Sequence, residues 1–211
     1  MKTNKILQIL GFVALTSLTG CSPEDDIKNP NFSPLIFSED YAVGAVDNTI
    51  LDTPNWTNFA EVGTVQWKEQ IFSGNPYAEF SSFLPSGSGQ TPEPINVGWL
   101  VSPTIDLDAT ENEILVFRAS QSFVTSAANS LEVLISTDFD GTNVATATWE
   151  PLPATLPTTS STYFQFIKSG EIDLSGYDGT VNIAFKVKGS GTNLALDGSY
   201  QVDDIRVYTK Q

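Results

Sequence analysis

The amino-acid sequence predicts an all-β domain of many short strands, either a sandwich or a barrel. Three observations lead to this prediction. Apolar and polar residues alternate over several short runs, the period of a half-buried strand. Asp-Gly pairs and Gly- or Pro-rich clusters separate the runs, as turns do. No stretch shows a sustained helical period of 3.6 residues. Short strands at regular spacing are typical of sandwiches and barrels.

The clearest single strand is expected at 181–188, where Val181, Ile183, Phe185 and Val187 share one face. Other strands are expected at 65–72, 77–83, 98–101, 114–117, 131–136 and 163–167. Turns are expected at 73–76, 86–89, 138–141 and 177–179.

The last strand contains a change of phase. Val202 sets one inward phase, whereas Ile205 and Val207 set the opposite one, and the change falls on Asp203-Asp204. A β-bulge produces such a slip and re-aims the side chains beside it. The alternative is that Val202 lies on the outer face of a regular strand.

The first 26 residues predict where the protein is located. Two lysines precede an apolar run at 6–18, and Leu18-Thr19-Gly20-Cys21 resembles the lipobox of bacterial lipoproteins. The resemblance implies a signal peptide at 1–20, lipidation of Cys21, the only cysteine, and a tether at 21–34. An ordinary signal peptide that ends near a cysteine is the alternative.

The acidic run Glu24-Asp25-Asp26 follows the cysteine closely. It resembles the export tag of surface-exposed lipoproteins in some Gram-negative bacteria. We therefore expect an outer-membrane protein that is lipid-anchored and faces the cell exterior. The alternative is a solvated charged linker.

Composition excludes several functions. Removal of residues 1–20 takes away two lysines and no acids, so 8 basic and 25 acidic side chains remain and the net charge is −17. Such a chain repels phosphate backbones and anionic lipid surfaces, so we expect no nucleic-acid partner. The remaining 191 residues suit one β-domain, which we place at 35–211.

The absence of histidine and the single cysteine exclude most nucleophilic catalysis. No Ser-His-Asp or Cys-His arrangement can form, and zinc and copper lack their usual ligands. Calcium binding, hydrolysis by a carboxylate pair, or no catalysis remain. No disulfide can form within one mature chain, so packing alone must hold the fold.

The segment Gly98-Trp99-Leu100-Val101-Ser102-Pro103-Thr104-Ile105-Asp106-Leu107 is the most diagnostic of several motifs that follow one another along the chain. The others include 37–41, Trp56, Trp67, 77–80, 131–141, 169–174, 182–186 and 200–207. In this order they resemble choice-of-anchor J domains, which are related to cleaved adhesin and MAM domains, and the resemblance covers about 35–209. It implies a galactose-binding-like jelly roll of two antiparallel sheets, associated with adhesion and carbohydrate binding.

The resemblance also implies a structural calcium ion between the opening and closing strands. Its ligands here would be Glu39, Asp40, Asp203 and Asp204. Relatives often have Glu where this chain has Ala42, so one ligand is missing unless Asp47 or a backbone carbonyl replaces it. The alternative is that Asp203 or Asp204 caps backbone amides at the bulge.

A second acidic segment, 138–143, looks like the start of an EF-hand loop. Trp149 stands where the bidentate acid belongs, and no helices flank the segment. We therefore expect an Asp-rich turn.

Exposed aromatic rings beside amides suit sugars, because rings stack on C–H faces and amides bind hydroxyls. Trp56, with Asn55 and Asn58, is the first candidate, followed by Tyr77 and Trp149. Burial is the alternative for each, and we expect Trp67 and Trp99 in the core.

We therefore expect a surface-anchored, non-catalytic carbohydrate or adhesion module that binds glycan or extracellular matrix. The alternative is a structural or partner-binding accessory of an outer-membrane complex. The third is a carboxylate-based glycoside hydrolase.

Overall fold

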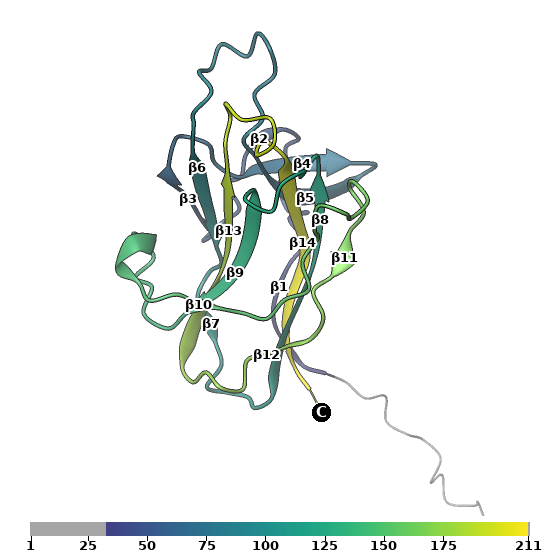
Figure 1. Ribbon diagram of the computed structural model, residues 1–211. Helices are drawn as coiled ribbons and strands as arrows, with labels where there is room; N and C mark the ends of the chain where they lie inside the picture. The colour runs from purple at the N-terminus through teal and green to yellow at the C-terminus, as the bar shows by residue number, and fades with distance from the viewer. Residues whose placement is uncertain (1–32, 211) are drawn as a thin grey trace, which may run out of the picture. The chain divides into compact units, whose positions relative to one another are not determined.

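Two antiparallel β-sheets pack face to face in the computed structural model, which describes residues 33–210 (Figure 1). The eight-stranded sheet contains, in spatial order, β11 (Ile167–Lys168), β8 (Glu113–Ser122), β14 (Ser199–Thr209), β5 (Asn75–Ser81), β4 (Lys68–Phe72) and β2 (Thr49–Ile50), with β1 (Leu35–Glu39) on β14 and β12 (Ile172–Asp173) on β8. The six-stranded sheet contains β10 (Glu150–Pro151), β9 (Ser130–Ser136), β13 (Thr180–Gly189), β6 (Asn96–Val101) and β3 (Thr57–Val62), with β7 (Ile105–Asp106) on β13.

The all-β prediction is confirmed: within 33–210 the only helical element is one 3₁₀ turn, η1 (Val144–Thr146). The strand expected at 163–167 is wrong in most of its length, because β11 begins only at Ile167. Phe164 has φ +59°, which breaks an extended strand, and its amide bonds the carbonyl of Gln121. No helix in this part of the chain is long and apolar enough to span a membrane.

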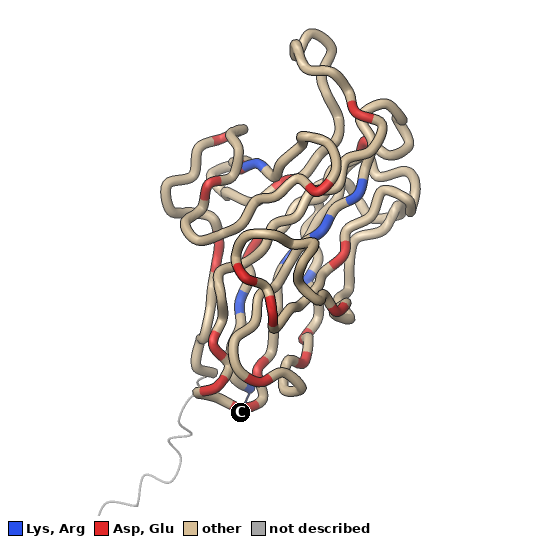
Figure 2. The backbone as a smooth tube through the Cα atoms, turned by 90° about the vertical axis from the view of Figure 1, so that its left-hand side faces the viewer, with Lys and Arg blue, Asp and Glu red and all other residues tan. Residues whose placement is uncertain are grey.

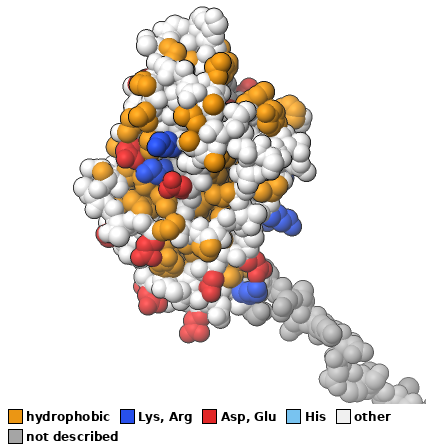
Figure 3. All heavy atoms as spheres, viewed as in Figure 1, with side chains coloured by type: hydrophobic (Ala, Val, Ile, Leu, Met, Phe, Trp, Pro, Cys, Tyr) orange, Lys and Arg blue, Asp and Glu red, His pale blue; other side chains and the backbone are white. Residues whose placement is uncertain are grey.

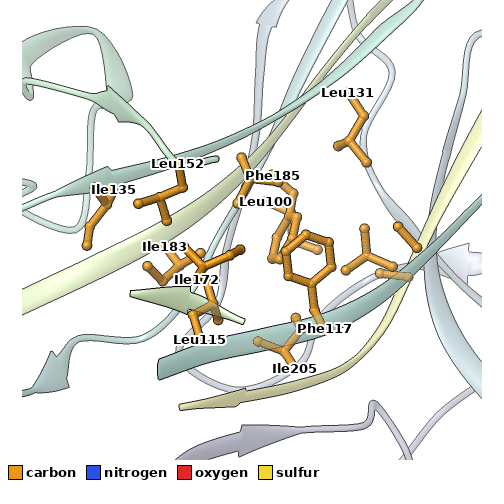
Figure 4. Packing of buried hydrophobic residues seen from close by; sticks show 14 of the residues in the cluster. Leu100, Leu115, Phe117, Leu131, Ile135, Leu152, Ile172, Ile183, Phe185 and Ile205 are labelled. Atoms are coloured by element: carbon orange, nitrogen blue, oxygen red, sulfur yellow. The ribbon is translucent and has the colours of Figure 1, made fainter. Parts of the chain in front are cut away.

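Large apolar side chains from both sheets form the main core (Figure 4). The rings of Phe117 on β8 and Phe185 on β13 meet edge to face with centroids 5.2 Å apart. Trp67 is fully buried 5.8 Å from Phe80, as expected for a core residue. A Cβ at Gly98 would lie 2.0 Å from the ring of Phe80, so this position requires glycine.

A second, smaller hydrophobic cluster lies on the outer face of the six-stranded sheet. Trp99 belongs to it, whereas its neighbour Leu100 points into the main core. Trp99 is therefore buried, as expected, but away from the core between the sheets. The segment 137–149 covers it, with the ring of Trp149 centred 5.2 Å from that of Trp99.

The β-bulge predicted in the last strand is confirmed. The register of β14 against β8 shifts between Asp203 and Arg206, and Asp204 has φ +51°. Val202, Ile205 and Val207 all belong to the main core between the sheets, which excludes an outward Val202. Because of the bulge, one edge of β14 pairs with β5 before it and with β1 after it.

Candidate functional site

The outer face of the eight-stranded sheet carries a row of polar side chains at its centre. Ser199 and Gln201 of β14 alternate with Tyr200 and Val202, which point into the core, so they share the outer face. Gln201 lies opposite Glu79 of β5 and Ser120 of β8, and Ser199 lies opposite Ser81 and Ser122. The polar ladder is defined by these six residues: Glu79, Ser81, Ser120, Ser122, Ser199 and Gln201.

Hydrogen bonds join the polar ladder across three strands. The Gln201 Nε2 donates to Glu79 Oε2 at 2.8 Å, and its Oε1 accepts from Ser120 Oγ at 2.7 Å. The hydroxyls of Ser122 and Ser199 are 2.7 Å apart. Gln201 and Ser120 are fully buried, so these bonds are needed to offset their desolvation. The ladder therefore holds Glu79 in a fixed position.

Glu79 is the ionisable end of the ladder and is half-buried. Burial raises the pKa of its carboxyl from 4.5, and the hydrogen bonds from Gln201 and Ser199 offset part of that shift. Glu79 also lines a groove.

A groove with a volume of about 660 Å³ lies beside Glu79 and Ser81. We call it the ladder groove. Its other walls are β4, with Lys68 and Gln70, and the segment 83–93, with Phe83 and Glu93. Phe83 is 54% exposed. Several hydrogen-bonding groups with some apolar surface suit a small ligand rich in hydroxyl groups.

An aromatic arm, residues 163–166, follows the opposite edge of β8. The rings of Tyr163 and Phe123 are 4.8 Å apart, and both are exposed. The ring of Phe166 lies 5.6 Å from that of Tyr77 on β5 and 5.3 Å from the guanidinium carbon of Arg118 on β8. Since β14 separates those strands, Phe166 reaches across the outer face of β14.

Tyr77, one of the predicted ligand residues, thus lies on the same face as the ladder. It is mostly buried, and burial, followed by the nearby charges of Glu79 and Asp47, raises its pKa to about 12. Its hydroxyl stays neutral at physiological pH.

The other predicted ligand residues lie elsewhere. Trp56 is half-buried, packs 5.6 Å from Tyr41 and donates from Nε1 to Glu39 Oε2. Asn58 holds the backbone of Trp67, because its Nδ2 donates to the Trp67 carbonyl and its Oδ1 accepts from the Trp67 amide. Asn55 is exposed with φ +67°.

Trp149 packs on the six-stranded sheet and donates to the carbonyl of Val144. Of the five residues, only Tyr77 therefore lies beside the polar ladder.

The sequence analysis did not predict Gln201, Ser199 and their partners as site residues. Polar residues do alternate with apolar ones in both β14 and β8, which indicates a polar outer face on each strand. The sequence does not show that β5, β14 and β8 are neighbours.

Each predicted calcium ligand already has a protein partner. Glu39 accepts from the amide of Tyr41 at 2.7 Å, and Asp40 accepts from that of Ala42 at 3.1 Å. Asp203 accepts from the amide of Asp204 at 2.7 Å, as the capping alternative expects.

Asp204 pairs with Arg118 at 3.0 Å. Between Ser33 and Lys210, no three acidic or cysteine side chains are arranged to hold a metal ion. Calcium stays a prediction.

The acidic segment 138–143 is an Asp-rich turn, as expected. Asp140 Oδ1 accepts from the hydroxyl and amide of Thr142 and from the amide of Asn143. These bonds lower the pKa of Asp140. The predicted signal peptide, Cys21 and most of the tether lie outside the described residues.

No family model matches the chain, and the comparison with curated proteins found no match. Among solved structures, the chain is similar to the K1 cleaved adhesin domain of Lys-gingipain from Porphyromonas gingivalis W83, at 15% identity and a TM-score of 0.48 over 83% of this chain and 98% of that one. It is also similar to the CBM22-1 xylan-binding domain of Xyn10C from Paenibacillus barcinonensis, at 13% identity and 0.43 over 85% and 97%. A third is the mannan-recognising module TmCBM27, at 16% identity and 0.43 over 85% and 99%.

Proposed function

We propose that the protein is a non-catalytic glycan-binding module and that the ladder groove is its binding site. The observation that carries the proposal is a hydrogen-bonded row of polar side chains that ends at Glu79, on the wall of an open groove of about 660 Å³. The row fixes Glu79 before any ligand arrives, so little ordering is needed on binding.

The lining groups match the hydroxyls of a sugar. Glu79 accepts hydrogen bonds, Lys68 donates them, and Gln70 does both. Phe83 offers an exposed ring for a C–H face. The chain carries a net charge of −15, and acidic residues are spread along the backbone of the domain (Figure 2), so a neutral sugar fits better than a polyanion.

Two carboxylates line the ladder groove, Glu79 and Glu93. Glu93 Oε2 accepts a hydrogen bond from the amide of Thr64 at 2.7 Å and another from the Thr64 hydroxyl at 3.2 Å. This oxygen of Glu93 is therefore already bonded within the protein. We therefore propose binding without hydrolysis.

The second candidate function is a protein-binding accessory of an outer-membrane complex. It is favoured by three exposed aromatic residues in one region, Phe123, Tyr163 and Phe164. Figure 3 shows one face of the domain, on which hydrophobic side chains are interspersed with polar atoms.

A glycan array probed with the full chain tests the proposed function. We expect binding to one class of neutral glycan. A blank array contradicts it, and capture of a specific outer-membrane protein in a pull-down then supports the accessory role.

The predicted lipid anchor, the surface exposure and the predicted calcium site can each be tested separately. If Cys21 is the anchor, labelled palmitate should enter the wild type and not Cys21→Ser, and surface exposure should make the domain accessible to protease on whole cells. If calcium binds Glu39, Asp40, Asp203 and Asp204, millimolar calcium should raise the melting midpoint and EDTA should reverse the rise.

A further inference from the structure

Both arginines of the chain line one groove on the outer face of the eight-stranded sheet. This arginine groove has a volume of about 450 Å³. It lies along β14 beyond the bulge, at a different place from the ladder groove, and none of its lining residues is shared with that groove. Its lining includes Val116, Arg118, Lys168, Asp204, Arg206 and Tyr208.

The bulge places one carboxylate between the two guanidinium groups. Asp204, with φ +51°, accepts from Arg118 at 3.0 Å through Oδ2 and from Arg206 at 3.3 Å through Oδ1. Each guanidinium has five N–H donors, and each of these bonds uses one. The side chains of Arg118 and Arg206 are 43% and 56% exposed, so further donors face solvent.

A third cation lies on the same face. Lys168 of β11 is opposite Arg118 in register, and adjacent opposite residues project to the same side of a sheet. Lys168 forms no ion pair within residues 33–210. Phe166, whose ring lies 5.3 Å from the Arg118 guanidinium carbon, restricts the movement of that side chain.

The charge of the groove is opposite to that of the protein. Arg118, Lys168 and Arg206 face the acids Asp204 and Glu171, which leaves one positive charge in a chain of net charge −15. The overall field repels a polyanion at long range, whereas a single anionic group enters the local cationic site. Arginine forks match the planar oxygens of carboxylates and the oxygens of sulfate esters.

We propose that the arginine groove binds one oxyanion, a carboxylate or a sulfate ester, carried on a saccharide. The saccharide part of this inference rests on the proposed glycan-binding function. Tyr208, which lines the groove, provides an aromatic surface for the sugar ring that carries the anion.

Nitrogen-15 NMR of the full chain tests the inference directly, because the only two arginine Nε–H signals belong to Arg118 and Arg206. Sodium glucuronate and sodium sulfate are the probes, with sodium chloride at equal ionic strength as the control. We expect both signals to shift and saturate, with a dissociation constant on the order of millimolar for one or both probes. Saturation by glucuronate alone or by sulfate alone identifies the oxyanion.

Matched variants sharpen the result. Lys168→Gln should weaken probe binding several-fold, and Lys188→Gln, on the six-stranded sheet, should leave it unchanged. Shifts equal to those in chloride overturn the inference. Binding of hexaglutamate at least about tenfold tighter than glucuronate also overturns it, in favour of an acidic peptide.

The proposed function fails in a different way. If the ladder groove does not bind glycan, the array of neutral glycans is blank while the glucuronate titration saturates. If the arginine groove does not bind an oxyanion, neutral glycans still bind and the arginine signals do not saturate.

Discussion

The outer faces of the two sheets differ in how each satisfies its side chains. On the six-stranded sheet, Trp99 and the apolar residues around it are covered by the chain's own segment 137–149. On the eight-stranded sheet, the polar ladder satisfies its own hydrogen bonds and leaves a groove beside it. The apolar cluster needs a cover, whereas the buried residues of the polar ladder are already satisfied by one another. The groove beside Glu79 and Ser81 can therefore stay open, so the eight-stranded sheet is the one with room for a ligand.

The largest effect is expected on the outer face of the six-stranded sheet, which segment 137–149 covers. Trp99→Ala removes the ring that contacts Trp149 and Lys186 and leaves a cavity under segment 137–149. We expect the free energy of unfolding to fall by about 3–5 kcal/mol in urea denaturation, with glycan binding retained in the folded protein. A fall of less than about 1 kcal/mol would show that this face does not depend on its cover.

A smaller effect is expected from a substitution in the polar ladder of the eight-stranded sheet. Gln201→Ala removes the shorter of the two ladder hydrogen bonds to Glu79 and leaves the buried hydroxyl of Ser120 without its partner. The free energy of unfolding should fall by about 1–3 kcal/mol, and glycan binding should be lost with it. Gln165→Ala, at an exposed position, is the control and should change stability by less than about 0.5 kcal/mol. Equal stability of the two variants would contradict a structural role for the ladder.

The smallest effect concerns pH. Because burial raises the pKa of Glu79 above 4.5, the folded state favours the protonated carboxyl. The stability that this protonated carboxyl contributes is fully present below pH 4.5, the pKa in the unfolded chain. It is lost as the pH rises through the raised pKa of the folded protein. From about pH 4 to about pH 7, the wild type should therefore lose stability relative to Glu79→Gln. Parallel pH curves for the two proteins would contradict the burial of this carboxyl.

Local patterns were sufficient to predict much of the fold. Alternation at 181–188 predicts β13, and the phase change at Asp203-Asp204 predicts the bulge, because both depend on neighbours in sequence. The strand at 163–167 fails because Phe164 turns back to bond Gln121, which the alternation of its side chains does not reveal.

The candidate site was harder to predict because its parts are distant in sequence. The hydrogen bond between Gln201 and Glu79 joins residues that are 122 positions apart in the sequence, and the one between Gln201 and Ser120 joins residues 81 positions apart. Trp56 stands among asparagines and looked like an exposed ring, yet it packs against Tyr41 and bonds Glu39. Only the pairing of β5, β14 and β8 brings the ladder together.

Glycan should bind to the outer face of the eight-stranded sheet and not to that of the six-stranded sheet. The most direct test is calorimetric titration of the glycan selected on the array into Glu79→Gln and Glu132→Gln, the same substitution in the ladder groove and at an exposed position of the six-stranded sheet. We expect Glu79→Gln to weaken binding by about tenfold or more and Glu132→Gln to bind as the wild type does. Wild-type affinity in Glu79→Gln, or a loss in Glu132→Gln alone, would contradict it.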